Sequence, residues 1–107
     1  MFEKNLSYLP LFDTYGKLLT ETQQKMFELY YGDDLSLSEI ADEMKITRQG
    51  VRDSIKRCEE ALVEFEEKLG FLKKINELSA AAQMLADSAN DENKVSEIAE
   101  RLLALCE

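Results

Sequence analysis

The 107-residue chain contains no histidine and only four glycines. Histidine is the commonest general base and a frequent metal ligand, so catalysis would have to rest on carboxylates, lysines or hydroxyls. The many Asp and Glu residues fall on predicted helix faces, where a solvated surface explains them better than acid–base chemistry. The few glycines form neither a GxxxxGK[ST] nor a GxGxxG phosphate-binding loop. We therefore expect no enzyme activity, no catalytic residue and no cofactor.

Cysteine is also scarce, with only Cys58 and Cys106. Two residues so far apart make neither a disulfide framework nor a metal-ligand spacing, so we expect no metal site. Each lies at an apolar position of a helical pattern. This position favours burial as a small hydrophobic side chain over reactivity.

Long hydrophobic runs are missing as well. No stretch approaches the 18 or so apolar residues that a membrane-spanning helix requires. The first residues, MFEKNLSYLPLF, lack the basic region and the cleavage site of a signal peptide. We expect a cytoplasmic protein without membrane insertion.

Helical periodicity runs along nearly the whole chain, without an alternating strand pattern or a hairpin signal, so we expect an all-α fold. Amphipathic stretches are predicted from Leu9 to Leu19 and from Thr20 to Gly32, with Pro10 in the first turn of the former. Two capping boxes mark helix starts, at Thr20 with Gln23 and at Ser36 with Glu39.

The segment SLSEIADEMKITRQGVRDSIKR, residues 36–57, predicts a helix-turn-helix. Lys45 takes a left-handed turn position, Ile46 fills the angle between the helices and Thr47 caps the second helix, which begins near Arg48. The apolar residues of the first helix that should face the core are Leu37, Ile40, Ala41 and Met44.

The second helix of this motif carries an apolar stripe beside a basic face. The stripe consists of Val51, Ile55, Cys58, Leu62, Phe65 and Leu69. From Lys45 to Arg57 the chain has five cations and one anion, Asp53, although its total net charge is −9. Because the start of a recognition helix meets base edges in the major groove, we predict base contacts there and phosphate contacts further along. The predicted nucleic-acid-binding residues are Lys45, Thr47, Arg48, Gln49, Arg52, Lys56 and Arg57.

An alternative is that these cations only balance neighbouring acids on a solvated helix. Four glutamates follow on the same arc, at positions 59, 60, 66 and 67, so any contact must end near Arg57. Each neutralised phosphate steepens the salt dependence by about 0.9 log units. With so few cations, a single copy should bind weakly.

Beyond Gly70 the apolar stripe changes phase, which predicts a helix break. A second heptad-like seam follows at Phe71, Ile75, Leu78, Ala82, Leu85 and Ala89, and a final helix carries Val95, Ile98, Leu102 and Leu105. We divide the chain into a helix-turn-helix domain with a long fourth helix, residues 1–69, and a C-terminal helical extension, residues 70–107. The extension packs either on the first domain or on the partner of a homodimer.

The segment LLTETQQKMFELYYGDDLSLSEIADEMKITRQGVRDSIKRCEEAL resembles the fourth region of sigma-70-type factors. It shares the L-T-x-x-Q entry, the S-L-x-E-I-A helix and the [ST]-R-x-x-V-[RK] recognition helix. Residues 11–69 are more closely similar to the YlxM-like family, down to LSLSEIADE, TRQGV and DSIKR. The chain departs from that family's pattern at Gly50 and Arg52, where an alanine and an aromatic are usual, and Arg52 adds a cation.

The YlxM-like resemblance implies a small helical bundle without a winged helix and a regulatory role in the signal recognition particle pathway, with the particle's RNA or GTPase as partner. The net charge of −9 favours this function, because it lowers non-specific affinity for DNA. The residues alone favour the alternative, a DNA-binding transcriptional regulator whose dimer reads major grooves about 34 Å apart. We do not expect a free-standing sigma factor, since 107 residues leave no room for its other regions.

Overall fold

The computed structural model describes residues 4–106, which form six α-helices and no strand. The helices are α1 (Tyr8–Tyr15), α2 (Glu21–Phe27), α3 (Leu37–Met44), α4 (Arg48–Leu69), α5 (Phe71–Asp87) and α6 (Glu92–Leu105). A short 3-10 turn, η1 (Gly16–Leu18), follows α1, and a π-helical turn, η2 (Glu28–Gly32), follows α2. The predicted all-α fold is confirmed. The chain divides between Leu69 and Gly70 into two compact units.

Both predicted capping boxes are present. The N–H of Gln23 donates to Thr20 Oγ1 at 3.2 Å while the Gln23 side chain accepts from the Thr20 N–H at 3.1 Å. Ser36 and Glu39 exchange the same two bonds, each at 3.1 Å. Because each box satisfies two otherwise unpaired donors, it sets where α2 and α3 begin.

The helix predicted to run to Gly32 ends there, but its last turn is a π-turn that the apolar spacing did not indicate. Asp33 N–H closes this wider turn on the Glu28 carbonyl at 3.0 Å. Within it Leu29 is buried, while Tyr30 and Tyr31 are half-buried with their rings 5.0 Å apart, edge to face. The turn thus sets two neighbouring tyrosines on the surface of the first unit.

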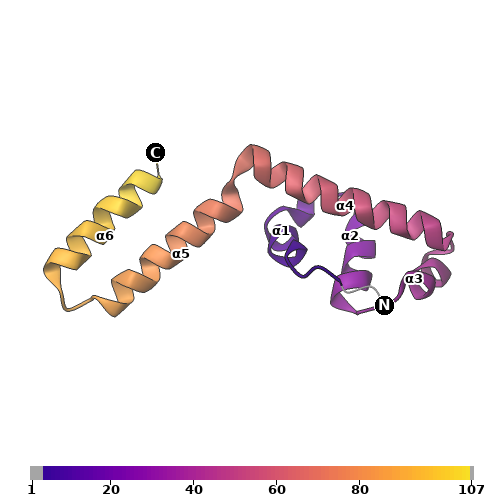
Figure 1. Ribbon diagram of the computed structural model, residues 1–107, viewed down its shortest axis with the longest axis horizontal. Helices are drawn as coiled ribbons and strands as arrows, with labels where there is room; N and C mark the ends of the chain where they lie inside the picture. The colour runs from indigo at the N-terminus through magenta and orange to yellow at the C-terminus, as the bar shows by residue number, and fades with distance from the viewer. Residues whose placement is uncertain (1–3, 107) are drawn as a thin grey trace. The chain divides into compact units, whose positions relative to one another are not determined.

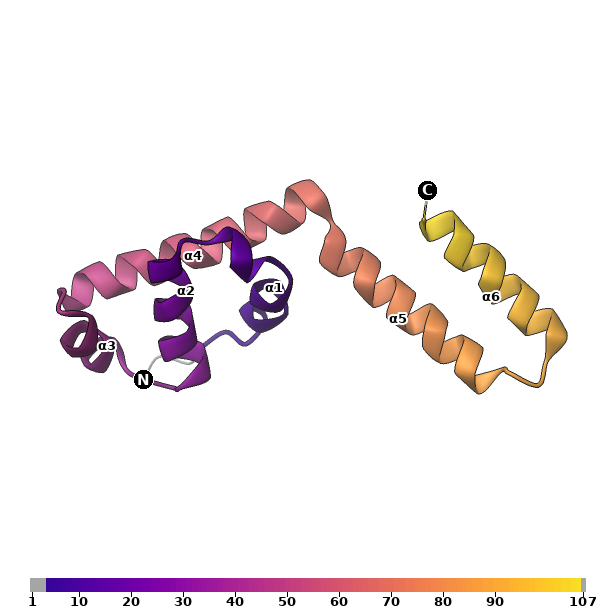
Figure 2. The ribbon, with the colours of Figure 1, turned by 180° about the vertical axis from the view of Figure 1, so that it is seen from behind.

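In the first unit, α1, α2 and α3 all pack against α4 and lie on the same side of it (Figures 1 and 2). Its predicted stripe is confirmed at the four residues that are fully or almost fully buried, Val51, Ile55, Cys58 and Leu62. Phe65 is half-buried against the Leu62 cluster. The prediction is wrong at Leu69, which is 45% exposed because α4 extends past the helices that pack on it.

The first predicted stretch is also shorter than expected. Helix α1 ends at Tyr15, and the 3-10 turn that follows changes the direction of the next side chains. Leu19 is consequently buried, whereas Leu18 is 59% exposed and does not belong to the core.

Helices α5 and α6 form the second unit and lie side by side as a hairpin (Figure 1). The predicted break at Gly70 is present, with φ of 64°. The face that packs against α6 centres on Ala81, about 80° around the helix from the predicted seam at Phe71. Phe71, Ile75 and Leu78 are exposed within the second unit itself, so their packing on the first domain or on a dimer partner stays a prediction; the small Ala81 lets α6 approach closely. Ala89 lies beyond the end of α5.

Helix α6 begins at its N-cap residue Asp91, whose side chain accepts from the N–H groups of Asn93 and Lys94. The turn predicted over residues 90–93 therefore lies two residues earlier, over residues 88–91. Ile98 is buried and the other three predicted apolar positions are half-buried, as expected. Cys106 is exposed, because it follows the last turn of α6, so the burial predicted for it is wrong.

Candidate nucleic-acid interface

The turn between α3 and α4 has the geometry that the sequence predicts. Lys45 has φ of 58° and ψ of 43°, in the left-handed region. The N–H of Ile46 donates to the Ala41 carbonyl at 3.1 Å, which is the bond that closes a Schellman motif. Ile46 itself is 42% exposed, so it does not fill the angle between the helices, where Ala41 and Val51 are buried.

Thr47 caps α4 as predicted. Its Oγ1 accepts from the N–H of Gly50 at 2.9 Å. A Cβ on residue 50 would lie 3.1 Å from this oxygen, so glycine here lets the capping hydroxyl approach closely. Thr47 therefore positions the helix, and its hydroxyl is already engaged.

All seven predicted nucleic-acid-binding residues are exposed. Four of them, Arg48, Gln49, Arg52 and Lys56, share an arc of about 100° around α4. We call these four residues together with Lys45, in the preceding turn, the basic face. Arg57 lies about 180° around the helix from Arg48, so the structure does not bring it to the same surface.

One anion borders the basic face. Gln49 Nε2 donates to Asp53 Oδ1 at 2.9 Å, one helical turn away. A base edge that used the Gln49 amide would therefore have to compete with Asp53.

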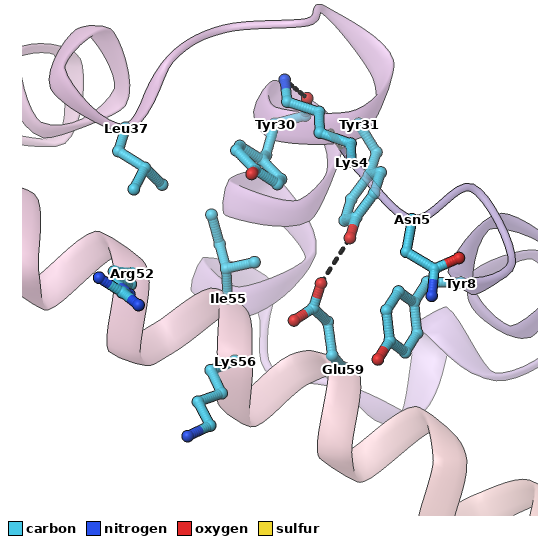
Figure 3. A pocket seen from close by; sticks show the side chains of 10 residues that line it. All are labelled: Lys4, Asn5, Tyr8, Tyr30, Tyr31, Leu37, Arg52, Ile55, Lys56 and Glu59. Atoms are coloured by element: carbon cyan, nitrogen blue, oxygen red, sulfur yellow. Dashed lines mark hydrogen bonds between the residues drawn. The ribbon is translucent and has the colours of Figure 1, made fainter. Parts of the chain in front are cut away.

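A groove runs along the basic face. Its first part is a pocket of about 250 Å³ lined by Leu37, Arg48, Gln49 and Arg52. A second pocket, of about 380 Å³ and drawn in Figure 3, shares Leu37 and Arg52 with the first, so the two adjoin. We call the second one the tyrosine pocket; its lining residues are Lys4, Asn5, Tyr8, Tyr30, Tyr31, Leu37, Arg52, Ile55, Lys56 and Glu59.

Lys4 builds one wall of the tyrosine pocket. Its ammonium donates to the carbonyls of Tyr30 and Leu35 and to the carboxylate of Asp34, and it lies 4.0 Å from the centre of the Tyr30 ring. These partners satisfy all three donors of the ammonium. Lys4 is therefore a clamp between the N-terminal segment and η2, and its charge is already compensated by Asp34.

The floor of the pocket holds a fixed carboxylate. Tyr31 donates its hydroxyl proton to Glu59 Oε2 at 2.5 Å, and Figure 3 shows Glu59 between the rings of Tyr31 and Tyr8. Burial, and then this bond, raise the pKa of Tyr31 far above its usual value, so the hydroxyl stays a donor. Burial and the charge of Glu59 raise the pKa of Tyr30 in the same direction.

Sequence reasoning missed the tyrosine pocket. Both tyrosines are half-buried, Tyr30 against the core cluster that contains Ile40 and Tyr31 against the one that contains Leu62. The available signal was the adjacent Tyr-Tyr pair itself, because two successive residues cannot both face the core of a regular helix.

Within residues 4–106, no three His, Cys, Asp or Glu side chains come together as ligands for a metal ion. No helix in the same range combines the length and the apolar character needed to cross a membrane.

Comparison with known proteins places this fold in a family. Residues 2–102 match the family model UPF0122, described as "Putative helix-turn-helix protein, YlxM / p13 like". The chain belongs to the UPF0122 family. The predicted YlxM-like resemblance is confirmed, and the match continues beyond residues 11–69 into α5 and α6.

Individual UPF0122 proteins agree with this assignment. One from Halalkalibacterium halodurans is 47% identical over 107 residues, which cover 100% of this chain and 94% of that protein. One from Bacillus cereus is 45% identical over 97 residues, covering 91% of this chain and 88% of the relative. One from Desulforamulus reducens is 55% identical over 67 residues, 63% of this chain, and the aligned part is only 57% of that protein's length.

Proposed function

We propose that this UPF0122 protein is a non-enzymatic regulatory protein that binds nucleic acid through its helix-turn-helix and acts as an accessory protein of the signal recognition particle pathway. The observation that carries the nucleic-acid part is the exposed basic face on the first turns of α4. In helix-turn-helix proteins this is the part of the second helix that enters a groove. The basic face is positively charged, although the net charge of the whole chain is −9.

The pathway assignment rests on the YlxM-like resemblance and on that acidic balance. A net negative chain binds bulk DNA poorly, which suits a protein that seeks one particular RNA or a basic protein surface. Side chains cannot read the deep major groove of an RNA helix, so an RNA partner would be held by its phosphates, loops and shape. In that case Lys56 should contribute as much to binding as Arg48.

A DNA-binding transcriptional regulator is the second candidate. It is favoured by the common arc of Arg48, Gln49 and Arg52, since arginine and glutamine are suited to bidentate bonds with guanine and adenine in the major groove. A regulator of this kind would be a cytoplasmic homodimer that reads two half-sites. The exposed Ile75 and Leu78 on α5 are apolar surface that such a dimer would bury.

Binding measurements with salt titration test both candidates. The probes are the signal recognition particle RNA and a set of DNA duplexes of different sequence, with wild type, Arg48→Ala, Lys56→Ala and the control Lys17→Ala on η1. Each lost phosphate contact should reduce the slope of log affinity against log salt by about 0.7 to 0.9, and Lys17→Ala should change nothing. Equal loss in both basic-face variants on the RNA supports the pathway proposal.

Other results contradict it in defined ways. A loss of sequence discrimination on DNA with Arg48→Ala, beside a uniform loss with Lys56→Ala, supports the transcriptional regulator instead. Affinities in both basic-face variants equal to those of wild type and Lys17→Ala would show that the basic face binds no nucleic acid. Affinity capture from lysate, with and without nuclease, then shows whether the particle's GTPase is held through RNA.

A further inference from the structure

The groove along α4 changes character from one end to the other. At the start of the helix its walls are Arg48, Gln49 and Arg52, and about two turns later they are aromatic rings. Arg52 and Lys56 are among the residues that line the tyrosine pocket, on its α4 side (Figure 3). A duplex groove does not require a concave aromatic site at this place, so the helix-turn-helix alone does not explain it.

The three tyrosines form one continuous aromatic surface. The rings of Tyr8 and Tyr31 are 6.4 Å apart and those of Tyr30 and Tyr31 are 5.0 Å apart. The pocket volume of about 380 Å³ is at the small end of the range for ligand sites, which suits a single planar ring system. Ile55 closes the pocket on the α4 side with apolar surface.

We propose that the tyrosine pocket binds the base of one unpaired nucleotide, whose flanking phosphates lie on Arg52 and Lys56. This inference rests on the proposed binding of nucleic acid by the basic face. Sites for unpaired nucleotides combine a cationic track for the backbone with aromatic rings on which a base stacks. The groove has both components, because Arg52 and Lys56 lie beside the aromatic rings of the tyrosine pocket.

Glu59 gives the site a preference among bases. Tyr31 holds one carboxylate oxygen, Oε2, and Glu59 is one of the residues that line the pocket. A carboxylate accepts from the amino groups of cytosine and adenine, whereas uracil and thymine present a carbonyl in the equivalent place. The pocket should therefore discriminate against uracil and thymine.

The test uses hairpins that differ in a single nucleotide. One RNA hairpin carries a bulged 2-aminopurine, and its control has the same base paired in the stem; DNA hairpins of the same sequences form a second pair. Wild type should bind the bulged RNA roughly tenfold or more tightly than the paired one and should quench the base fluorescence, because the base stacks. The chain has no tryptophan to obscure this signal. Preference for a bulge in DNA instead would assign the same pocket to single-stranded DNA.

Matched variants separate the ring from its hydroxyl. Tyr30→Phe should keep the preference for the bulged hairpin, whereas Tyr30→Leu should lose it and retain the affinity for the paired hairpin. If circular dichroism shows that Tyr30→Leu is unfolded, the pair Tyr8→Phe and Tyr8→Leu makes the same comparison. Glu59→Gln should reduce the discrimination between a bulged cytosine and a bulged uracil.

The failure of this inference is distinct from the failure of the proposed function. If wild type binds bulged and paired hairpins equally, and Arg48→Ala weakens both, the pocket is not a base site while the basic face still binds nucleic acid. If no hairpin binds at all, both proposals are overturned.

Discussion

Lys45 should make the first unit less stable than glycine would at the same position, but it places a cation on the basic face. Its φ of 58° places it in the left-handed region that glycine adopts without strain. A non-glycine residue there costs about 1–2 kcal/mol. Replacing Lys45 by glycine removes this cost. Glycine also makes the unfolded chain more flexible, which lowers the free energy of unfolding by about 0.4–1 kcal/mol. Lys45→Gly should therefore stabilise the first unit by about 0.5–1 kcal/mol.

The same substitution should weaken nucleic-acid binding. A gain of 1 kcal/mol raises the Tm of a domain of this size by roughly 4–8 °C, so we expect a rise of about 2–8 °C. Loss of one phosphate contact should lower the salt slope by about 0.9 on duplex DNA. Thermal unfolding by circular dichroism and a salt titration of binding measure the two effects on one sample.

Lys45→Arg is the matched control, because it keeps both the charge and the strained backbone and should leave Tm and salt slope near those of wild type. An unchanged or lower Tm in Lys45→Gly would refute the strain argument. A higher Tm with an unchanged salt slope would remove Lys45 from the basic face.

Three further predictions concern the core, the thiols and the second unit. Leu62→Ala, at a fully buried position, should destabilise the first unit by about 2–5 kcal/mol in urea unfolding, whereas the exposed Leu18→Ala should change it little; equal effects would contradict the packing described. Burial raises the pKa of Cys58 to about 11, so at pH 8 a thiol reagent should modify the exposed Cys106 quickly and Cys58 only after unfolding, and rapid labelling of both would show an open core. If the apolar surface of α5 holds a homodimer, sedimentation should show a dimer that Ile75→Glu dissociates; a wild-type monomer at all concentrations excludes it.

Much of the first unit could be predicted because its signals are local. Capping boxes, a left-handed lysine and a stripe of period 3.6 depend on neighbours within one turn, and the residues that show them, Thr20, Ser36 and Lys45, behave as expected. The same is true of Thr47, whose hydroxyl caps α4.

Predictions that depended on distant packing were less successful. Leu69 fits the α4 stripe but is exposed, because α4 extends past the helices that pack on it. No local sequence signal shows where that packing ends. Helix α5 has two apolar faces, and its sequence does not show which of them packs against α6. In the structure the Ala81 face is buried and the Phe71 face is exposed. The tyrosine pocket requires a π-turn and the Lys4 clamp, which joins residues 26 to 31 positions apart. The residues of the basic face could be named from the sequence, but not the groove beside them.

The charge order along α4 opposes the helix macrodipole. Helices α2, α3 and α6 each have a glutamate in the first turn, whereas the first turn of α4 has no acidic residue and begins with Arg48. A cation at that end is unfavourable by about 0.3–1 kcal/mol. A phosphate held there would supply the missing negative charge and meet the exposed N–H groups of the first turn. Occupancy by a polyanion should therefore protect the first amides of α4 from hydrogen exchange, linking the order of this helix end to its ligand.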